Sequence, residues 1–194
     1  MTKEDKIFLL DLARKKIAQK LGINWTGYKN IQISAPGKDV KEVKGTFVTL
    51  SIDGNLRGCI GQIIPDEAII ETIGQNAQSA AFHDPRFPQL DSKEFESVEV
   101  EISILSKPER LTYSNADELL DKIKKDIQGL IIRSGGHSAT FLPQVWDDIE
   151  TEEEFLSHLC MKASLPAEEW RKGKLEVYTY TVEHFDEKEL GLNL

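Results

Sequence analysis

The stretch VEVEISI, residues 98–104, has the most regular pattern in the sequence, with valine or isoleucine at every second position and glutamate or serine between them. Because successive side chains of a strand point to opposite faces, this alternation predicts a strand with one buried and one polar face. Strands of this kind are typical of antiparallel sheets that are covered on one side only. The stretch therefore indicates a one-sided antiparallel sheet.

Further strands are predicted on both sides of this stretch. Residues 48–52 alternate in the same way, and the turn Asp53-Gly54-Asn55 and then LRGCIGQII follow them, which predicts an antiparallel hairpin. GLIIRSGGHSATFLP, residues 129–143, predicts a second hairpin around its SGGH segment. LEVYTYTV, residues 175–182, alternates as a closing strand.

Four helices are predicted between these strands from apolar residues at helical spacing and from capping signals. They cover residues 2–21, 65–82 and 115–126 and a segment that begins at Thr151. The order α-ββ-α-β-α-ββ-α-β joins the strands through hairpins instead of regular βα crossovers. It predicts an α+β fold, with antiparallel sheets and flanking helices, in a single domain over residues 1–194.

Composition limits the classes of function. The chain has 194 residues, a net charge of −9 and no cluster of lysine and arginine, so nucleic acid is not expected as a partner. No apolar run approaches the roughly 20 residues of a membrane span, so no membrane association is expected. The two cysteines lie far apart in the sequence. We therefore expect a soluble protein in a reducing compartment, the cytoplasm.

LRGCIG, residues 56–61, places Cys59 between two glycines and two residues after Arg57. On a regular strand Arg57 and Cys59 point to the same face, where the guanidinium would favour the thiolate. Gly58 and Gly61 would permit a bulge or the close approach of a ligand. We interpret Cys59 as a candidate catalytic thiol, with Arg57 and both glycines as ligand-binding residues. Alternatively, Cys59 fills a sheet core, Arg57 is solvated and the glycines make room for a packed helix.

The loop HDPRFPQL, residues 83–90, contains further candidates. Asp84 and Arg86 flank a proline that fixes the local backbone, so they could present a charged pair to a ligand. His83 could act as a base or proton donor near neutral pH. The alternative is that Asp84 and Arg86 cap backbone groups or bind each other, while the flanking phenylalanines anchor the loop in the core.

The second cysteine and another histidine lie on the last predicted helix. His158 falls outside its apolar stripe and is expected at the surface, with a catalytic role beside Cys59 as the alternative. Cys160 belongs to the stripe and is expected to be an inert core thiol. The four histidines are too scattered to suggest a facial triad for iron, and the chain has no CxxxCxxC motif for an iron–sulfur cluster. We predict no metal and no cofactor.

Six blocks in the same order carry a resemblance to a known family: LRGCIG after GTFVTL, AAFHDPRFPQL, EISILSKPE, FLPQVW, FLSHLCMKASLP and LEVYTYTVEHF. They resemble the AMMECR domain family, whose prokaryotic members are called AmmeMemoRadiSam system protein A. The similarity extends from Leu9 to about Phe185. Ser164, in place of the usual glycine of a KAGLP-like block, and Gln89, in place of a common second proline, depart from the family pattern.

The resemblance implies one compact α+β fold of two closely packed subdomains with a cleft beside LRGCIG. It also implies an association with a radical S-adenosylmethionine protein and a Memo-type protein. We therefore expect small-molecule binding or thiol-dependent processing at a cleft around Cys59, with Arg57 and Arg86 as anion-binding groups and a histidine as proton carrier. The alternative, from a different class, is a non-catalytic partner or adaptor protein in which LRGCIG is a structural corner.

Overall fold

The computed structural model describes all residues, 1–194, and the contacts within the chain divide it into two units. Unit 1 comprises Met1–Leu105 and Glu183–Leu194, and unit 2 comprises Ser106–Val182. The chain forms two four-stranded antiparallel sheets with flanking helices, so the predicted α+β fold class is confirmed. None of the helices combines the length and the apolar composition that a membrane span requires.

Unit 1 is built around sheet A, whose strand order is β2-β1-β3-β8. Its elements are α1 (Lys3–Leu21), the 3-10 helix η1 (Asp39–Lys41), β1 (Thr46–Ile52), β2 (Asn55–Gln62), α2 (Ile69–Phe82), β3 (Glu99–Leu105) and β8 (Val182–Asp186). The alternating stretch at residues 98–104 thus forms β3, one of the two central strands of the sheet.

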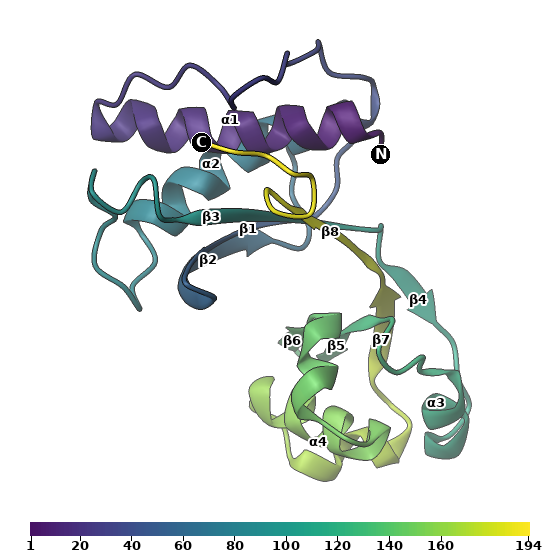
Figure 1. Cartoon of the computed structure of the whole chain (residues 1–194). Coiled ribbons are helices and arrows are strands. Elements are labelled where there is room, and N and C mark those ends of the chain that lie inside the picture. Colours follow the sequence, from purple (N-terminus) through teal and green to yellow (C-terminus); the bar gives the residue numbers. More distant parts are fainter. The chain divides into compact units, whose positions relative to one another are not determined.

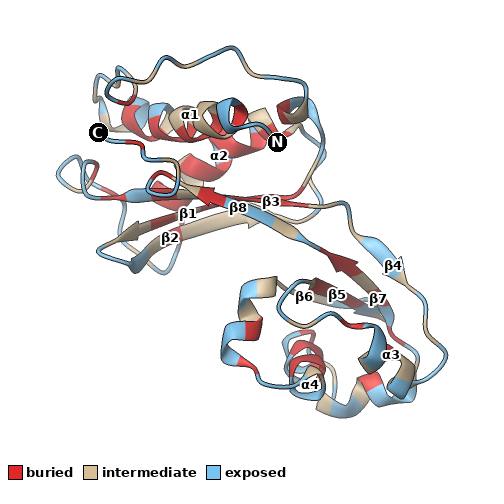
Figure 2. Cartoon of the chain, turned by 45° about the vertical axis from the view of Figure 1, so that its right-hand side comes forward, coloured by how far each residue is buried: buried red, intermediate tan, exposed pale blue.

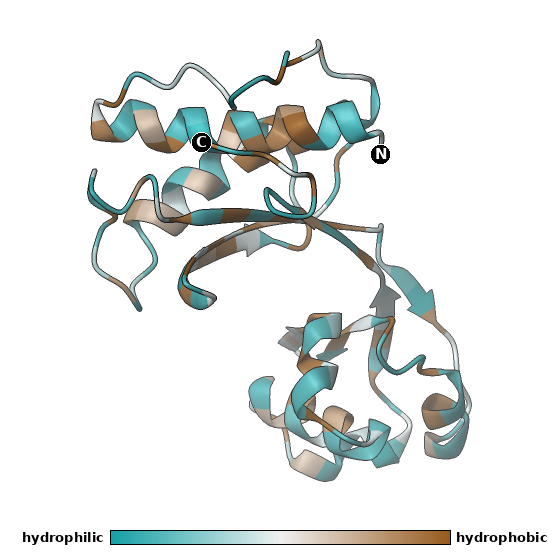
Figure 3. Ribbon diagram, in the orientation of Figure 1, coloured by the Kyte–Doolittle hydropathy of each residue, from teal (hydrophilic) through white to brown (hydrophobic).

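The two long helices of unit 1 cover one face of sheet A. α1 and α2 lie side by side over β1 and β3 (Figure 1). Hydrophobic and hydrophilic residues both occur along α1 (Figure 3), and both helices carry buried residues (Figure 2). The buried residues of α1, among them Leu10, Ala13 and Ile17, recur at helical spacing and form the side that faces the core. The core beneath them contains apolar side chains of the helices and of the inner face of the sheet, among them Leu10, Ile17, Leu50, Ile73 and Ile102. The alternate positions of the strands, which are mostly polar, lie on the other face of the sheet.

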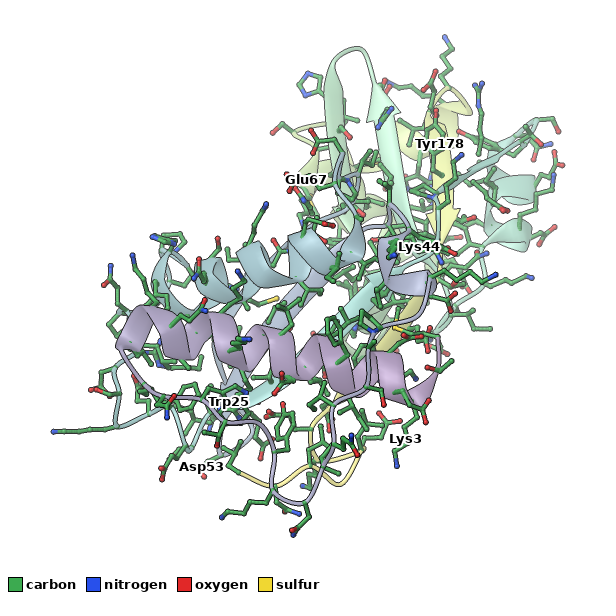
Figure 4. The ribbon with its side chains drawn as sticks, turned by 90° about the horizontal axis from the view of Figure 1, so that it is seen from above. Lys3, Trp25, Lys44, Asp53, Glu67 and Tyr178 are labelled. Atoms are coloured by element: carbon green, nitrogen blue, oxygen red, sulfur yellow. The ribbon has the colours of Figure 1, made fainter.

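The ends of α1 follow the sequence signals. The side chain of Thr2 accepts a hydrogen bond from the N–H of Asp5, and the Asp5 carboxylate accepts one from the N–H of Thr2, which together form a capping box. Gly22 ends the helix with a φ of 72°. Trp25, labelled beside α1 in Figure 4, donates from its indole N–H to Asp11 Oδ1 at 2.8 Å.

A buried ion pair joins α1 to the residues that follow β8. Nε and Nη2 of Arg14 donate to the two carboxylate oxygens of Glu187 at 2.7 and 2.6 Å, and the two side chains are 1% and 8% exposed. Four other groups of unit 1 hydrogen-bond to this pair: the carbonyl oxygens of Phe95 and Val98, the hydroxyl of Tyr28 and the N–H of Val100. The charges are therefore buried with hydrogen-bond partners on several segments of the unit.

Unit 2 is built around sheet B, whose strand order is β4-β7-β5-β6. Its elements are β4 (Glu109–Leu111), α3 (Ala116–Lys122), β5 (Gly129–Ser134), β6 (His137–Phe141), the 3-10 helix η2 (Pro143–Asp148), α4 (Glu152–Lys162), the 3-10 helix η3 (Ala167–Lys172) and β7 (Glu176–Tyr180). Unit 2 has a core of its own, in which the rings of Trp146 and Phe155 stack with centroids 3.8 Å apart.

Several predicted boundaries differ from the structure. The closing strand predicted at residues 175–182 contains all of β7 and the first residue of another strand, because β7 ends at Tyr180 in sheet B and β8 begins at Val182 in sheet A. Alternation continues through this break and therefore does not reveal it. The three-residue strand β4 is too short to show a period. α2 begins later than predicted, at Ile69, and α3 ends earlier, at Lys122.

Candidate functional site

β2 is an edge strand of sheet A, and its pairing with β1 is irregular at Arg57. Leu50 pairs with Gly58, whereas the next pair toward the turn is Ser51 with Leu56, so Arg57 is an extra residue in β2. One extra residue of this kind is a β-bulge, which bends the strand and interrupts the alternation of its side chains. The assumption of a regular strand through LRGCIG is therefore wrong at Arg57.

The guanidinium group of Arg57 is bound by the segment between α2 and β3. Its Nε and Nη2 atoms donate to the two carboxylate oxygens of Glu94 at 2.8 and 2.9 Å, and Nη1 donates to the carbonyl oxygen of Pro88 at 2.9 Å. The hydrogen bonds from Arg57 lower the pKa of Glu94 from its ordinary value. Because its charge is paired, Arg57 contributes less to a thiolate at Cys59, or to an anionic ligand, than a solvated arginine would. Its ligand-binding role stays a prediction.

Asp84 and Arg86 bind the backbone of Cys59 at the edge of β2. The Cys59 N–H donates to Asp84 Oδ2 at 2.9 Å, and Arg86 Nη2 donates to the Cys59 carbonyl oxygen at 3.2 Å. Arg86 also donates from Nε and Nη2 to the Asp84 carboxylate at 3.0 and 2.7 Å. These hydrogen bonds replace those that a neighbouring strand would make with an edge strand. We refer to this arrangement of Asp84 and Arg86 as the edge clamp.

The two members of the edge clamp have different environments. The side chain of Asp84 is 2% exposed and that of Arg86 is 54% exposed. The hydrogen bonds from the Arg86 side chain hold the pKa of Asp84 well below its usual range, and the N–H groups of Cys59 and Arg86 act in the same direction. Asp84 therefore stays charged although it is buried. The clamp positions the Cys59 peptide, and contact of either side chain with a ligand stays a prediction.

The two glycines of LRGCIG lie where other groups of unit 1 approach the backbone closely. A Cβ atom at Gly58 would lie 2.2 Å from the carbonyl oxygen of Ala80 in α2. A Cβ atom at Gly61 would lie 2.2 Å from the carbonyl oxygen of Thr46 and 2.4 Å from the ring of Phe47. Packing therefore accounts for a glycine at both positions. Gly58 makes room for helix α2, as the structural alternative expects, whereas Gly61 makes room for β1 and not for a helix. Ligand binding by these glycines stays a prediction.

Cys59 is partly exposed, and its side chain lies on the face of sheet A opposite α1 and α2. Cys59 pairs with Thr49, whose Oγ1 donates to the sulfur at 3.3 Å. Thr49 pairs in turn with Glu101 of β3. Paired residues of adjacent strands have their side chains on the same face, so these three side chains form one row across three strands. We refer to Cys59, Thr49 and Glu101 as the thiol row.

Glu101 has two titratable neighbours on β8, the strand beside β3. Burial raises the pKa of the Glu101 carboxyl, His184 opposes this increase and Asp186 adds to it. Glu101 therefore keeps its proton to a higher pH than an ordinary glutamate. None of these three residues, nor Thr49, is a candidate from the sequence. The alternation at residues 98–104 places Glu101 on the polar face, but only the strand register places it in a row with Cys59.

The remaining predicted site residues lie elsewhere in the chain. His83 is the exposed C-cap of α2, one residue before Asp84, and His158 is exposed on α4 of unit 2. A proton-transfer role for either histidine stays a prediction.

Cys160 is fully buried in the core of unit 2 and burial raises the pKa of its thiol, so its predicted core position is confirmed. The structure contains no group of three or more His, Cys, Asp or Glu side chains that could hold a metal ion.

Comparison with known proteins finds relatives along most of the chain. The model of the AMMECR1 family matches residues 10–185. Protein MK0488 from Methanopyrus kandleri is 39% identical over 197 residues, covering 97% of this chain and 91% of that protein. Protein MJ0810 from Methanocaldococcus jannaschii is 38% identical over 196 residues, covering 97% of this chain and 93% of that protein.

A solved structure has the same fold. The uncharacterized protein PH0010 from Pyrococcus horikoshii matches with a TM-score of 0.79 and 34% sequence identity, covering 96% of this chain and 93% of that one. The match agrees with the α+β architecture of two antiparallel sheets. The names of these three relatives state no activity.

Proposed function

This chain belongs to the AMMECR1 family, and from that premise we propose that the polar face of sheet A binds a small molecule beside Cys59, whose thiol takes part in processing it. The single observation that supports the proposal best is the thiol row. It combines a partly exposed cysteine, a hydroxyl that donates to the sulfur and a carboxyl with a raised pKa. The predicted cleft around Cys59 is part of this proposal.

The chemistry of the thiol row follows from its three groups. A hydrogen bond from the Thr49 hydroxyl stabilises negative charge on the Cys59 sulfur, and the thiolate is the nucleophilic form. Side chains of directly paired residues are about 5 Å apart, so Glu101 lies roughly 10 Å from the sulfur. A small organic molecule can bridge that distance. Glu101 would then hold a proton at one end of the ligand while Cys59 contacts the other.

The edge clamp supports the same proposal as a positioning device. It holds both the N–H and the carbonyl oxygen of Cys59, so the peptide that carries the thiol has a fixed orientation. Reactive groups need this kind of support from neighbouring hydrogen bonds. His83 directly precedes the clamp in the sequence and remains our candidate for a proton carrier.

A second candidate function is that of a non-catalytic partner or adaptor protein. It is favoured by the close packing at Gly58 and Gly61 and by the ion pair of Arg57 with Glu94, because the fold needs these features even without a ligand. LRGCIG would then be a structural corner. The partners would be those that the family resemblance implies, a radical S-adenosylmethionine protein and a Memo-type protein.

Alkylation of the native full-length protein separates the two functions. Iodoacetamide at neutral pH, followed by peptide mass spectrometry, should modify Cys59 well before the buried Cys160. Thr49→Val removes the hydroxyl donor and should slow modification of Cys59 about twofold to tenfold, the equivalent of one hydrogen bond. Thr49→Ser keeps the hydroxyl and serves as the matched control. If Cys59 reacts no faster than Cys160 in the folded protein, the thiol is a packing group and the adaptor function takes the lead.

A further inference from the structure

Two shallow hollows of unit 2 meet at the start of β7. One is lined by the β5–β6 hairpin, residues 133–138, and the other by residues 110–113, at β4 and just after it. Lys174 and Glu176 line both hollows. Neither hollow contains a residue of the thiol row or of the edge clamp, so a ligand bound in them would be distinct from the one proposed at Cys59.

The charged side chains of the two hollows are mostly cationic. Arg110, Arg133 and Lys174 line the hollows together with a single carboxylate, that of Glu176. Arg133 pairs with Glu176 across the strands, and Arg110 Nη2 lies 4.0 Å from the Glu176 carboxylate. One carboxylate neutralises only one of three cations, which leaves an excess of two positive charges in a chain whose net charge is −9. A local excess of this sign attracts anions.

An aromatic ring lies beneath one of the cations. The guanidinium carbon of Arg133 is 5.3 Å from the ring centroid of Tyr178, which is labelled on β7 in Figure 4. Arg110 pairs with Tyr178 on the other side, so the two arginines belong to strands that flank β7. A guanidinium that lies over a ring face keeps its N–H edge available for oxygen acceptors.

The hairpin turn supplies neutral donors beside these cations. The ladder of β5 and β6 ends at the pair Ser134 and His137, so the N–H groups of Gly135 and Gly136 lie outside it. Both glycines have a positive φ, of 54° and 89°, as in the tight two-residue turns of hairpins. A Cβ atom at either position would meet nothing within 4 Å, so the turn is open to a ligand. His137 Nδ1 donates to the carbonyl oxygen of Ala163 at 2.9 Å, which fixes the imidazole beside the turn.

We propose that the hairpin end of unit 2 is a binding site for the phosphate group of a small organic phosphate. Arg133 and Lys174 supply the charge, and the N–H groups of Gly135 and Gly136 donate hydrogen bonds. A phosphate group matches this lining better than a carboxylate does, because it carries more charge and more acceptor oxygens for several donors. This site is independent of the thiol row.

The test is a titration of the isotope-labelled full-length protein with inorganic phosphate, followed by two-dimensional NMR at constant ionic strength. The amide signals of Gly135 and Gly136 should shift along a saturable curve. Arg133→Gln and Lys174→Gln should each raise the apparent Kd about threefold to fivefold, the effect of one exposed charge contact. Arg171→Gln is the matched control, because Arg171 is an exposed cation of unit 2 that is already paired with Glu168 and Glu153. It should leave the Kd unchanged.

Three results would overturn the proposal. Shifts that grow linearly with phosphate would indicate only a general salt effect. An apparent Kd that Arg133→Gln and Lys174→Gln leave unchanged would place binding elsewhere. Equal affinity for acetate would remove the preference for phosphate. The spectrum of each variant shows at once whether the fold is intact, so loss of binding is distinguished from loss of structure.

Discussion

Two of the arginine–carboxylate pairs of unit 1 have nearly the same ion-pair distance and very different surroundings. Arg14 and Glu187 approach to 2.6 Å and are both buried, and they are 173 positions apart in the sequence. Arg86 and Asp84 approach to 2.7 Å, are two positions apart, and only the carboxylate is buried. The first pair connects distant segments of the unit, whereas the second holds one peptide at a strand edge. The structural role of each pair therefore depends on how deeply its charges are buried and on which segments it holds together, and not on the distance between the two charged groups.

The largest effect is expected at the buried pair. Glu187→Gln would leave the Arg14 guanidinium buried without a counter-charge, which costs about 3–5 kcal/mol of unfolding free energy in comparable cases. Urea unfolding followed by circular dichroism measures this loss. Glu189→Gln is the matched control, since Glu189 is an exposed glutamate two positions away. A loss below about 1 kcal/mol for Glu187→Gln would place the buried pair in the same class as an exposed one.

The edge clamp should have an intermediate effect that depends on pH. Asp84→Asn removes charged hydrogen bonds and should cost about 1–3 kcal/mol at neutral pH. Because the pKa of Asp84 is lowered in the folded protein, its contribution is present above the unfolded pKa of about 4 and is lost as pH falls through the lower folded value. The difference in urea midpoint between the variant and the wild type should therefore shrink below pH 4.

The control for this pH profile is Asp66→Asn, which removes an exposed carboxylate of the same unit. It should leave the urea midpoint nearly unchanged at every pH. A difference between Asp84→Asn and the wild type that stays constant down to the acid-unfolding range would mean that the ionised form of Asp84 is not what stabilises the clamp.

The smallest effect on stability is expected at the ion pair of Arg57 and Glu94. This pair lies at the same edge strand, β2, as the edge clamp, and it is less buried than the pair of Arg14 and Glu187. Glu94→Gln should cost no more than about 1 kcal/mol of stability. Glu94→Gln also leaves the charge of Arg57 unpaired, so this charge should favour the Cys59 thiolate more and alkylation by iodoacetamide should become faster. Because the charge is paired in the wild type, Arg57→Gln should change the alkylation rate less than about twofold. A large slowing by Arg57→Gln would show that this guanidinium acts on the thiol despite its carboxylate.

Most of the fold can be predicted from patterns that lie within one element. The alternation at residues 98–104 gives β3, and the caps at Thr2 and Gly22 give both ends of α1. Contacts between distant segments do not have such a pattern. Arg14 stands four positions after Leu10, on the apolar side of α1, which is a sign that it is buried. Nothing near Arg14 in the sequence indicates that its partner is Glu187.

The candidate site is predicted only in part, because it depends on register. Counting back from the hairpin turn, a regular ladder would pair Thr49 with Gly58 and point Cys59 toward the core side. The bulge at Arg57 moves the pairing by one residue, so that Thr49 meets Cys59. The thiol, the charged loop and the glycines can all be recognised as candidates from the sequence. The neighbours of the thiol, Thr49 and Glu101, cannot.

Unit 1 is discontinuous in the chain, and this has a consequence for biosynthesis. Translation proceeds from the N-terminus, so every residue of unit 2 is made before Glu187. Until then the carboxylate that pairs with Arg14 in the folded protein has not been synthesised, and β3 lacks its neighbouring strand β8. Unit 2, by contrast, is one continuous segment, complete at Val182. During translation, therefore, all residues of unit 2 are available for folding before unit 1 is complete, although the first residues of unit 1 leave the ribosome earlier.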